Sequence, residues 1–245
     1  MSRLISAEFG YSCRMTLTCS GIAAVADTDD QAVYLPQHDS YLLVEAMLRC
    51  TPPRGLRVAD LCTGTGVVAA AAAAAQARSV SAFDQCPRAA EHARSRAAAA
   101  NVKVEVFHAS WRRAVSMAPF DLVVCNPPYV PQPPGDRTDL TGVPVPALAV
   151  DGGANGRKIL DPLCMAAPRL LRAGGTILVV QSEVADIAAT LMMLLRSGLH
   201  ASVVAERMVP FGPVLRRRAR WLEQTGRLPV GRRVERLAVI AGVKS

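Results

Sequence analysis

The stretch 123–129 constrains the fold of this chain more than any other. Its first three residues, Val123–Cys125, are apolar and are typical of a buried strand. Asn126 and two prolines follow, and because proline cannot pair within a sheet the strand must end there. Asn126 and Tyr129 are therefore presented at the carboxyl end of the strand, where open α/β sheets bind their ligands.

The Asn126 side chain and the Pro127 carbonyl group are two neighbouring hydrogen-bond acceptors. Together they can hold both hydrogens of a planar –NH2 group and aim its nitrogen lone pair at an electrophile, while Tyr129 offers a ring face for stacking. The pattern indicates nucleophilic displacement by an amide or aromatic amine nitrogen. The motif holds no histidine or carboxylate, so we expect the released proton to go to solvent. An ordinary proline-rich turn is the alternative interpretation.

A second constellation begins at the predicted strand 56–61 and its turn, Cys62–Gly66, which leads into an alanine-rich helix. The glycines let a ligand approach the backbone, and the helix N-terminus favours an anionic group. The next predicted strand, 79–83, ends at Asp84, whose carboxylate can accept hydrogen bonds from ribose hydroxyls. This combination predicts a nucleoside site. Gly64, Gly66 and Ala69 also fit the dinucleotide fingerprint, so a nicotinamide or flavin oxidoreductase stays an alternative.

The rest of the chain alternates between helical and strand patterns. Predicted helices cover 41–48, 67–77, 87–100, 157–172 and 184–196, with a short one inside 213–233, and further predicted strands cover 102–107, 121–125, 176–181, 201–209 and 234–241. Asp39 or Ser40 can cap the first helix. Ser110 and Trp111 follow the third strand, within reach of a bound adenine if the sheet is doubly wound. Residues 14–25 predict a small β-hairpin, and the proline-rich loop 131–146 is long enough to be a lid.

Composition narrows the partners and the compartment. The net charge is +8, and nine arginines fall between Arg207 and Arg236. Such a cluster fits an acidic partner such as RNA or the ribosome, although a solvated helix face is an equal alternative. The seven cysteines form no C-x-x-C pair, which favours small buried side chains in a reducing cytoplasm over metal ligands. No apolar run is long enough for a membrane span.

Three segments together resemble the class I S-adenosylmethionine (SAM) methyltransferases that act on exocyclic or amide nitrogens, namely Asp60–Gly66, Asp84 and Asn126–Tyr129. Within this class the chain looks most like the HemK-type release-factor glutamine methyltransferases, through segments 33–40 and 151–157. The resemblance spans residues 33 to about 195. It implies a Rossmann-like seven-stranded mixed sheet with helices on both faces and an antiparallel last strand, formed by a domain at 33–245 after an extension at 1–32.

The resemblance also implies roles for individual residues. The methionine part of SAM would lie against the turn, Asp84 would hold the ribose, and Ser110 and Trp111 the adenine. Asn126 and the Pro127 carbonyl would fix the target nitrogen beside Tyr129. The residues expected to contact SAM are Ser40, Asp60, Cys62, Thr63, Gly64, Gly66, Asp84, Ser110, Trp111 and Asn126.

The resemblance implies a protein glutamine as substrate, in a translation release factor. N6-adenine methylation of RNA or DNA and a SAM-binding protein without turnover remain alternatives. The chain departs from the family pattern in three ways. It lacks the N-terminal helical domain of the bacterial enzymes, like the short branch that works with a small zinc-ribbon activator. Ser110 stands where many relatives have an aspartate, and the arginine-rich insertion at about 213–233 is not part of the common pattern.

Overall fold

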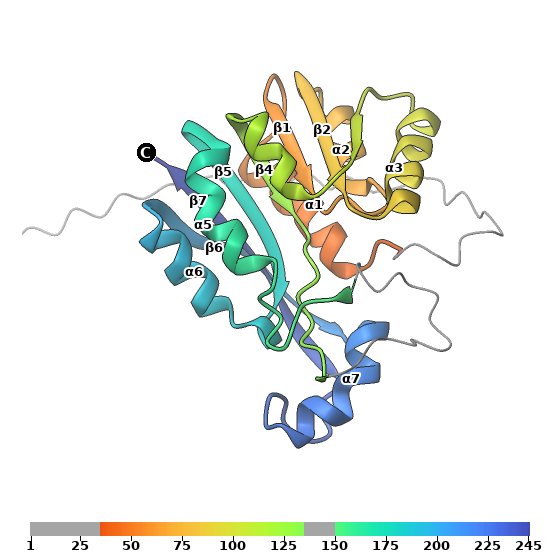
Figure 1. The fold of residues 1–245 in the computed structure, drawn as a ribbon, viewed down its shortest axis with the longest axis vertical. Coiled ribbons are helices and arrows are strands. Elements are labelled where there is room, and N and C mark those ends of the chain that lie inside the picture. The colour runs from red at the N-terminus through yellow and green to blue at the C-terminus, as the bar shows by residue number, and fades with distance from the viewer. Residues whose placement is uncertain (1–34, 135–149) are drawn as a thin grey trace, which may run out of the picture.

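The computed structural model describes residues 35–134 and 150–245, which form one seven-stranded sheet with helices on both faces (Figure 1). The strand order is β3-β2-β1-β4-β5-β7-β6. The predicted seven-stranded mixed sheet is thereby confirmed. The predicted hairpin at 14–25 and most of the proline-rich loop lie outside the described residues.

The sheet is parallel except for its last strand. The strands are β1 (Arg57–Leu61), β2 (Ser79–Asp84), β3 (Glu105–His108), β4 (Phe120–Cys125), β5 (Leu171–Ser182), β6 (Leu199–Pro210) and β7 (Val234–Lys244). Strands β3, β2, β1, β4 and β5 pair in parallel, whereas β7 lies between β5 and β6 and is antiparallel to both. The antiparallel last strand is as predicted.

Helices cover the two faces in separate layers. The first layer holds α1 (His38–Cys50), α2 (Val67–Ala74) and α3 (Pro87–Ala99), and the second holds η1 (Trp111–Ser116), α5 (Leu160–Leu170) and α6 (Ile187–Arg196). The first helix begins at His38 and not at a cap formed by Asp39 or Ser40, so that prediction is wrong. Both side chains are instead turned toward residues of the 126–129 stretch.

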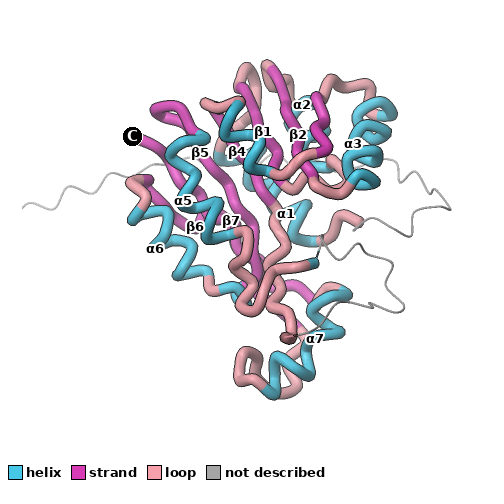
Figure 2. The backbone as a smooth tube through the Cα atoms, viewed as in Figure 1, coloured by secondary structure: helices cyan, strands magenta, loops and turns pink. Residues whose placement is uncertain are grey.

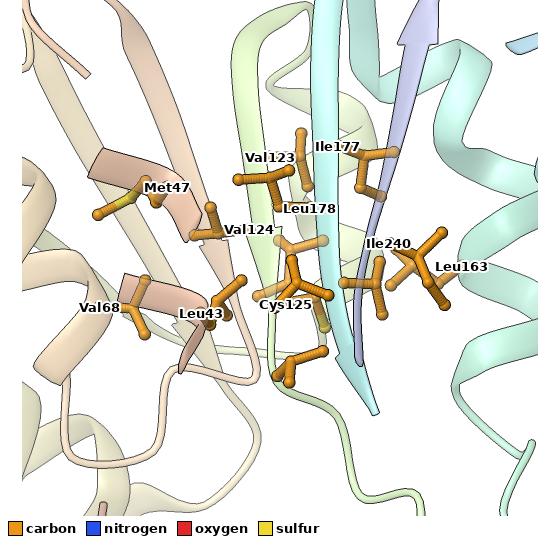
Figure 3. Packing of buried hydrophobic residues seen from close by; sticks show 14 of the residues in the cluster. Leu43, Met47, Val68, Val123, Val124, Cys125, Leu163, Ile177, Leu178 and Ile240 are labelled. Atoms are coloured by element: carbon orange, nitrogen blue, oxygen red, sulfur yellow. The ribbon is translucent and has the colours of Figure 1, made fainter. Parts of the chain in front are cut away.

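The core lies on both sides of β4. Val123 and Val124 are fully buried because this strand has a neighbour on each edge and a helical layer on each face. Figure 3 shows Leu43 and Met47 of α1 on one side of these valines, and Leu163 of α5 on the other. A continuous apolar strand is what two covered faces require.

The insertion between β6 and β7 folds as a separate small unit. Its helix α7 (Pro213–Gln224) lies beyond the helical layers at one end of the sheet (Figure 2). It is stabilised by a cluster of its own, formed by Phe211, Leu215, Ala219, Leu222 and Leu228, with Val130 and Val184 packed against it. Among the described residues no helix combines the length and apolar character needed to cross a bilayer.

Candidate active site

The two predicted motifs meet at the carboxyl ends of two neighbouring central strands. Strands β1 and β4 are neighbours, with Leu61 paired to Cys125, so the glycine turn and Asn126 leave the sheet side by side. A cavity of about 200 Å³ opens there. Of the predicted site residues, those that line it are Ser40, Asp60, Cys62, Thr63, Gly64, Asp84, Trp111 and Asn126, whereas Gly66, Ser110, Pro127 and Tyr129 do not.

The glycine turn is held from beneath by Asp60. Its Oδ2 accepts hydrogen bonds from Thr63 Oγ1 (2.6 Å) and from the Ala69 N–H (3.0 Å) at the start of α2. Burial raises the pKa of the Asp60 carboxyl to about 7, against the lowering effect of these hydrogen bonds. Gly64 has φ +55° and open space where a Cβ would be, so the cavity reaches its backbone. Gly66 has φ +76° and packs against Ala93.

Asp84 joins the second strand to this turn. Its Oδ2 accepts from the Gly64 N–H (2.9 Å), and its Oδ1 accepts from the Cys86 N–H (2.8 Å). Burial raises the pKa of the carboxyl, and the backbone hydrogen bonds oppose that rise. Each carboxylate oxygen has a further lone pair, so Asp84 can still accept hydrogen bonds from a ligand in the cavity that it lines.

Trp111 and Ser110 have different surroundings. The Trp111 ring is only 3 % exposed and forms part of the cavity wall, with the Arg112 guanidinium 4.9 Å from the ring centroid. Ser110 is the N-cap of η1, where its Oγ accepts from the Arg112 N–H at 3.4 Å. The Ser110 side chain thus serves the helix start and does not reach the cavity.

Helix α1 holds both ends of the 126–129 stretch. Asn126 Nδ2 donates to Ser40 Oγ at 3.1 Å, which leaves Asn126 Oδ1 as the acceptor of that amide. The Tyr129 hydroxyl donates to Asp39 Oδ2 at 2.9 Å, and Asp39 Oδ1 accepts from the Ser40 N–H at 2.6 Å. Sequence reasoning missed this role of Asp39, although its position beside Ser40 in the resemblance segment was a usable signal.

A second cavity, of about 60 Å³, lies on the other side of Asn126. Its walls include Pro127, Tyr129, Val130 and Asp39, and it shares Asn126 and Pro128 with the larger cavity. Tyr129 therefore lines the smaller cavity and not the larger one. The motif itself holds no carboxylate, but Asp39 reaches this cavity from α1.

The glycine-rich turn at 151–157 packs against the backbone of Tyr129 and Val130, at the end of the motif. A Cβ on Gly152 would lie 2.6 Å from the Val130 carbonyl oxygen, and one on Gly156 would overlap that of Tyr129. The buried Arg157 fixes this turn by donating to the carbonyl groups of Ala185 (2.5 Å) and Asp186 (2.9 Å). Lys158 pairs with Asp151 at the rim of the larger cavity, and no sequence signal pointed to that pair.

The comparisons with known proteins show the family to which the chain belongs. Residues 37–138 match the family model described as the methyltransferase small domain. The chain is 30 % identical over 179 residues to a putative protein N5-glutamine methyltransferase of Methanocaldococcus jannaschii, covering 73 % of this chain and 87 % of that protein. The chain belongs to the HemK-type glutamine methyltransferase family. SAM is in general the methyl donor of such methyltransferases.

One further relative and one solved structure show how far the similarity extends. The release factor glutamine methyltransferase of Mycolicibacterium smegmatis is 36 % identical over 151 residues, covering 58 % of this chain and 52 % of that protein. The chain thus spans about half the length of that relative. The Mtq2 structure from the E. cuniculi Mtq2–Trm112 complex has a TM-score of 0.58 at 24 % identity, covering 87 % of this chain and 99 % of that one, and it supports the fold.

Proposed function

We propose that this protein transfers the methyl group of SAM to the side-chain nitrogen of a protein glutamine, of the release-factor type. The observation that carries the proposal is the position of Asn126 between two cavities, with its Nδ2 engaged by Ser40 and its Oδ1 left to accept. This is the arrangement needed to hold a planar –NH2 group beside a methyl donor.

The larger cavity is lined by the polar groups that we expect to hold SAM. The exposed backbone at Gly64 suits the methionine part, together with Ser40, Thr63 and the Asp60-supported turn. Asp84 would accept from the ribose hydroxyls, and Trp111 would cover the adenine. The Ser110 side chain is used by η1, so adenine contacts at that position would come from the backbone. Bound there, SAM supplies an electrophilic methyl group.

The smaller cavity would receive the glutamine amide. Asn126 Oδ1 and the Pro127 carbonyl would accept its two hydrogens, and Tyr129 would contact the flat amide. The amide nitrogen would form the new bond to the methyl carbon as the bond between that carbon and the sulfonium sulfur of SAM breaks, with S-adenosylhomocysteine as the leaving group. The nitrogen would then lose one proton, which we assign to solvent. Asp39 accepts from the Tyr129 hydroxyl and from the Ser40 N–H, and we assign it the role of positioning Tyr129.

The M. smegmatis relative is a release factor glutamine methyltransferase, which supports a release factor as substrate. The E. cuniculi Mtq2–Trm112 complex, which is responsible for methylation of the eRF1 termination factor, supports a partner protein, to which we assign an activating role. The zinc-ribbon nature of that partner, and contact with RNA or the ribosome through the arginines, are further proposals. Several arginines of the cluster are already engaged, since Arg207, Arg232 and Arg233 pair with glutamates and Arg218 is buried.

The test combines donor binding with transfer. Wild-type protein should bind SAM in a calorimetric titration and should transfer labelled methyl groups to purified release factor. Asn126→Ala should lower kcat by about 100-fold or more while SAM affinity changes only a few-fold. Gln224→Ala, on the exposed surface of α7, is the matched control and should behave as wild type.

Other results would contradict the proposal. Label released from a cell extract by nuclease and not by protease would favour adenine methylation. Absence of SAM binding would remove the donor assignment. An Asn126→Ala protein with normal transfer would show that the amide does not hold the substrate.

A further inference from the structure

We infer that the arginine-rich insertion, residues 211–233, forms the outer wall of the smaller cavity, the acceptor cavity. Arg218 is the positioning residue that fixes this wall to residues 126–129, the acceptor motif. The inference rests on the proposed function, because it concerns the cavity assigned to the glutamine. It gives the insertion a role in choosing the protein substrate, in place of the RNA contact that its charge first indicates.

The insertion reaches the acceptor cavity directly. Val214, at the start of α7, lines the cavity together with Asn126 and Val150. The cluster beneath α7 continues to the motif, because Val130, which follows Tyr129, packs against it. A change in the position of α7 must therefore move the cavity wall.

Arg218 connects α7 to the chain directly after the acceptor motif and to Val150. Its side chain is 3 % exposed, and Nη1 donates to the carbonyl oxygens of Val130 (3.0 Å), Pro131 (3.3 Å) and Val150 (3.1 Å). These carbonyl groups stand where the segment 131–150 leaves the motif and where it returns. One charged group thus joins three backbone positions around the cavity, and hydrogen bonds of this kind are stronger than neutral ones.

The two ends of the insertion are joined to each other and to the rest of the fold. Gly212, which precedes α7, and Glu235 of β7 line the same small cavity, and the Phe211 N–H donates to the Arg233 carbonyl at 3.0 Å. Arg232 pairs with Glu183 of the short helix η2 (Glu183–Ala185) at 2.5 Å. Because both ends are fixed in this way, Arg218 has a stable helix from which to hold the motif.

Arg218 acts on the acceptor side alone. Neither Arg218 nor any other residue of 211–233 lines the larger cavity, which is formed by α1, the glycine turn, Asp84 and residues beside the motif. Loss of Arg218 should therefore disturb the position of the substrate amide and leave SAM binding unchanged. This separation distinguishes a positioning role from a general role in stability.

The experiment compares Arg218→Met, Arg218→Lys and the exposed control Arg216→Met in the full chain. Arg218→Met keeps most of the apolar stem and removes the donors. We expect its kcat/KM for purified release factor to fall about 100-fold, as for a misplaced substrate, with the Kd for SAM within twofold of wild type. Arg218→Lys should recover part of the loss, and Arg216→Met should match wild type within twofold.

Hydrogen exchange provides a readout that needs no acceptor. The Gln132 N–H donates to the Gly153 carbonyl at 2.9 Å, and the Gly152 N–H donates to the Val150 carbonyl at 3.1 Å. Both amides should exchange faster in Arg218→Met, while the Ala69 amide, bonded to Asp60, should not change. If wild-type protein methylates no release factor, the proposed function fails, and faster exchange still supports the structural part of the inference.

The contrary results are equally defined. A folded Arg218→Met protein with wild-type kcat/KM, or with unchanged exchange at Gln132 and Gly152, would overturn the inference. If Arg218→Met does not fold, Val214→Phe serves in its place. Val214 lines the cavity from the same helix, and a larger side chain at this position would narrow the cavity. It should raise the KM for the release factor about tenfold without altering SAM binding, and an unchanged KM would refute the role of the insertion.

Discussion

Gly156→Ala tests the support that the glycine-rich turn gives to the acceptor motif. Gly156 has φ +77°, a left-handed conformation that costs a non-glycine residue about 1–2 kcal/mol. An added Cβ would overlap the Tyr129 carbonyl oxygen and would lie 3.2 Å from the Cβ of Ala185, which is fully buried. Relief needs a backbone shift, for which overpacking adds about 1–3 kcal/mol. The expected loss in free energy of unfolding is therefore about 2–5 kcal/mol.

Gly198→Ala is the matched control, because Gly198 has φ +85° and nothing within 4 Å of an added Cβ. It should lose only about 1–2 kcal/mol in urea unfolding followed by circular dichroism. Methyl transfer by Gly156→Ala should also fall at temperatures where the protein is folded, since Tyr129 must move, whereas Gly198→Ala should retain transfer. Equal losses of stability and full activity in both variants would refute the reasoning.

Two further substitutions test single contacts. Tyr129→Phe removes the hydroxyl that donates to Asp39 and should lower the free energy of unfolding by about 2 kcal/mol. The control Tyr41→Phe, at a half-exposed residue, should have no effect. Equal free energies of unfolding for the two variants would contradict the contact. Burial raises the pKa of Glu235 from 4.5 to about 7, so its ionisation reduces stability as the pH rises through this range and the loss is complete above it. Glu235→Gln should therefore raise the free energy of unfolding at pH 8 by up to about 3 kcal/mol and have little effect at pH 4, and a destabilised variant at pH 8 would contradict this.

The strands and the two motifs could be predicted because each depends on local sequence. Val123 and Val124 form an apolar run that ends at prolines, and the turn at Gly64 follows its strand directly. The boundary between α5 and β5 could not be placed in this way. Leu171, predicted as helix, begins β5 because it pairs with Phe120, and Arg172 pairs with Asp121. Contacts distant in sequence decided that boundary.

Side-chain use was harder to predict than the backbone. Arginine at position 218 contributes to the charge count in the sequence, yet in the fold it is buried among carbonyl groups. Ser110 follows a strand at the expected place, but a local helix start uses its hydroxyl. The sequence predicts a capping role for Asp39. Its actual partner, Tyr129, lies 90 residues away and could not be found from the local pattern. The sequence pattern predicts where a residue lies along a helix or strand, and tertiary packing determines which group its side chain contacts.

The register between β1 and β4 has a consequence for how the two proposed sites are aligned. Leu61 and Cys125 are paired neighbours. The glycine turn and Asn126, which follow them, therefore leave the sheet one interstrand spacing apart, about 4.8 Å. Backbone hydrogen bonds set that offset, and no closing of two domains is needed to bring the sites together. Protein motions that bend this sheet would carry both sites together, and the geometry of transfer would be preserved while the surrounding loops change shape.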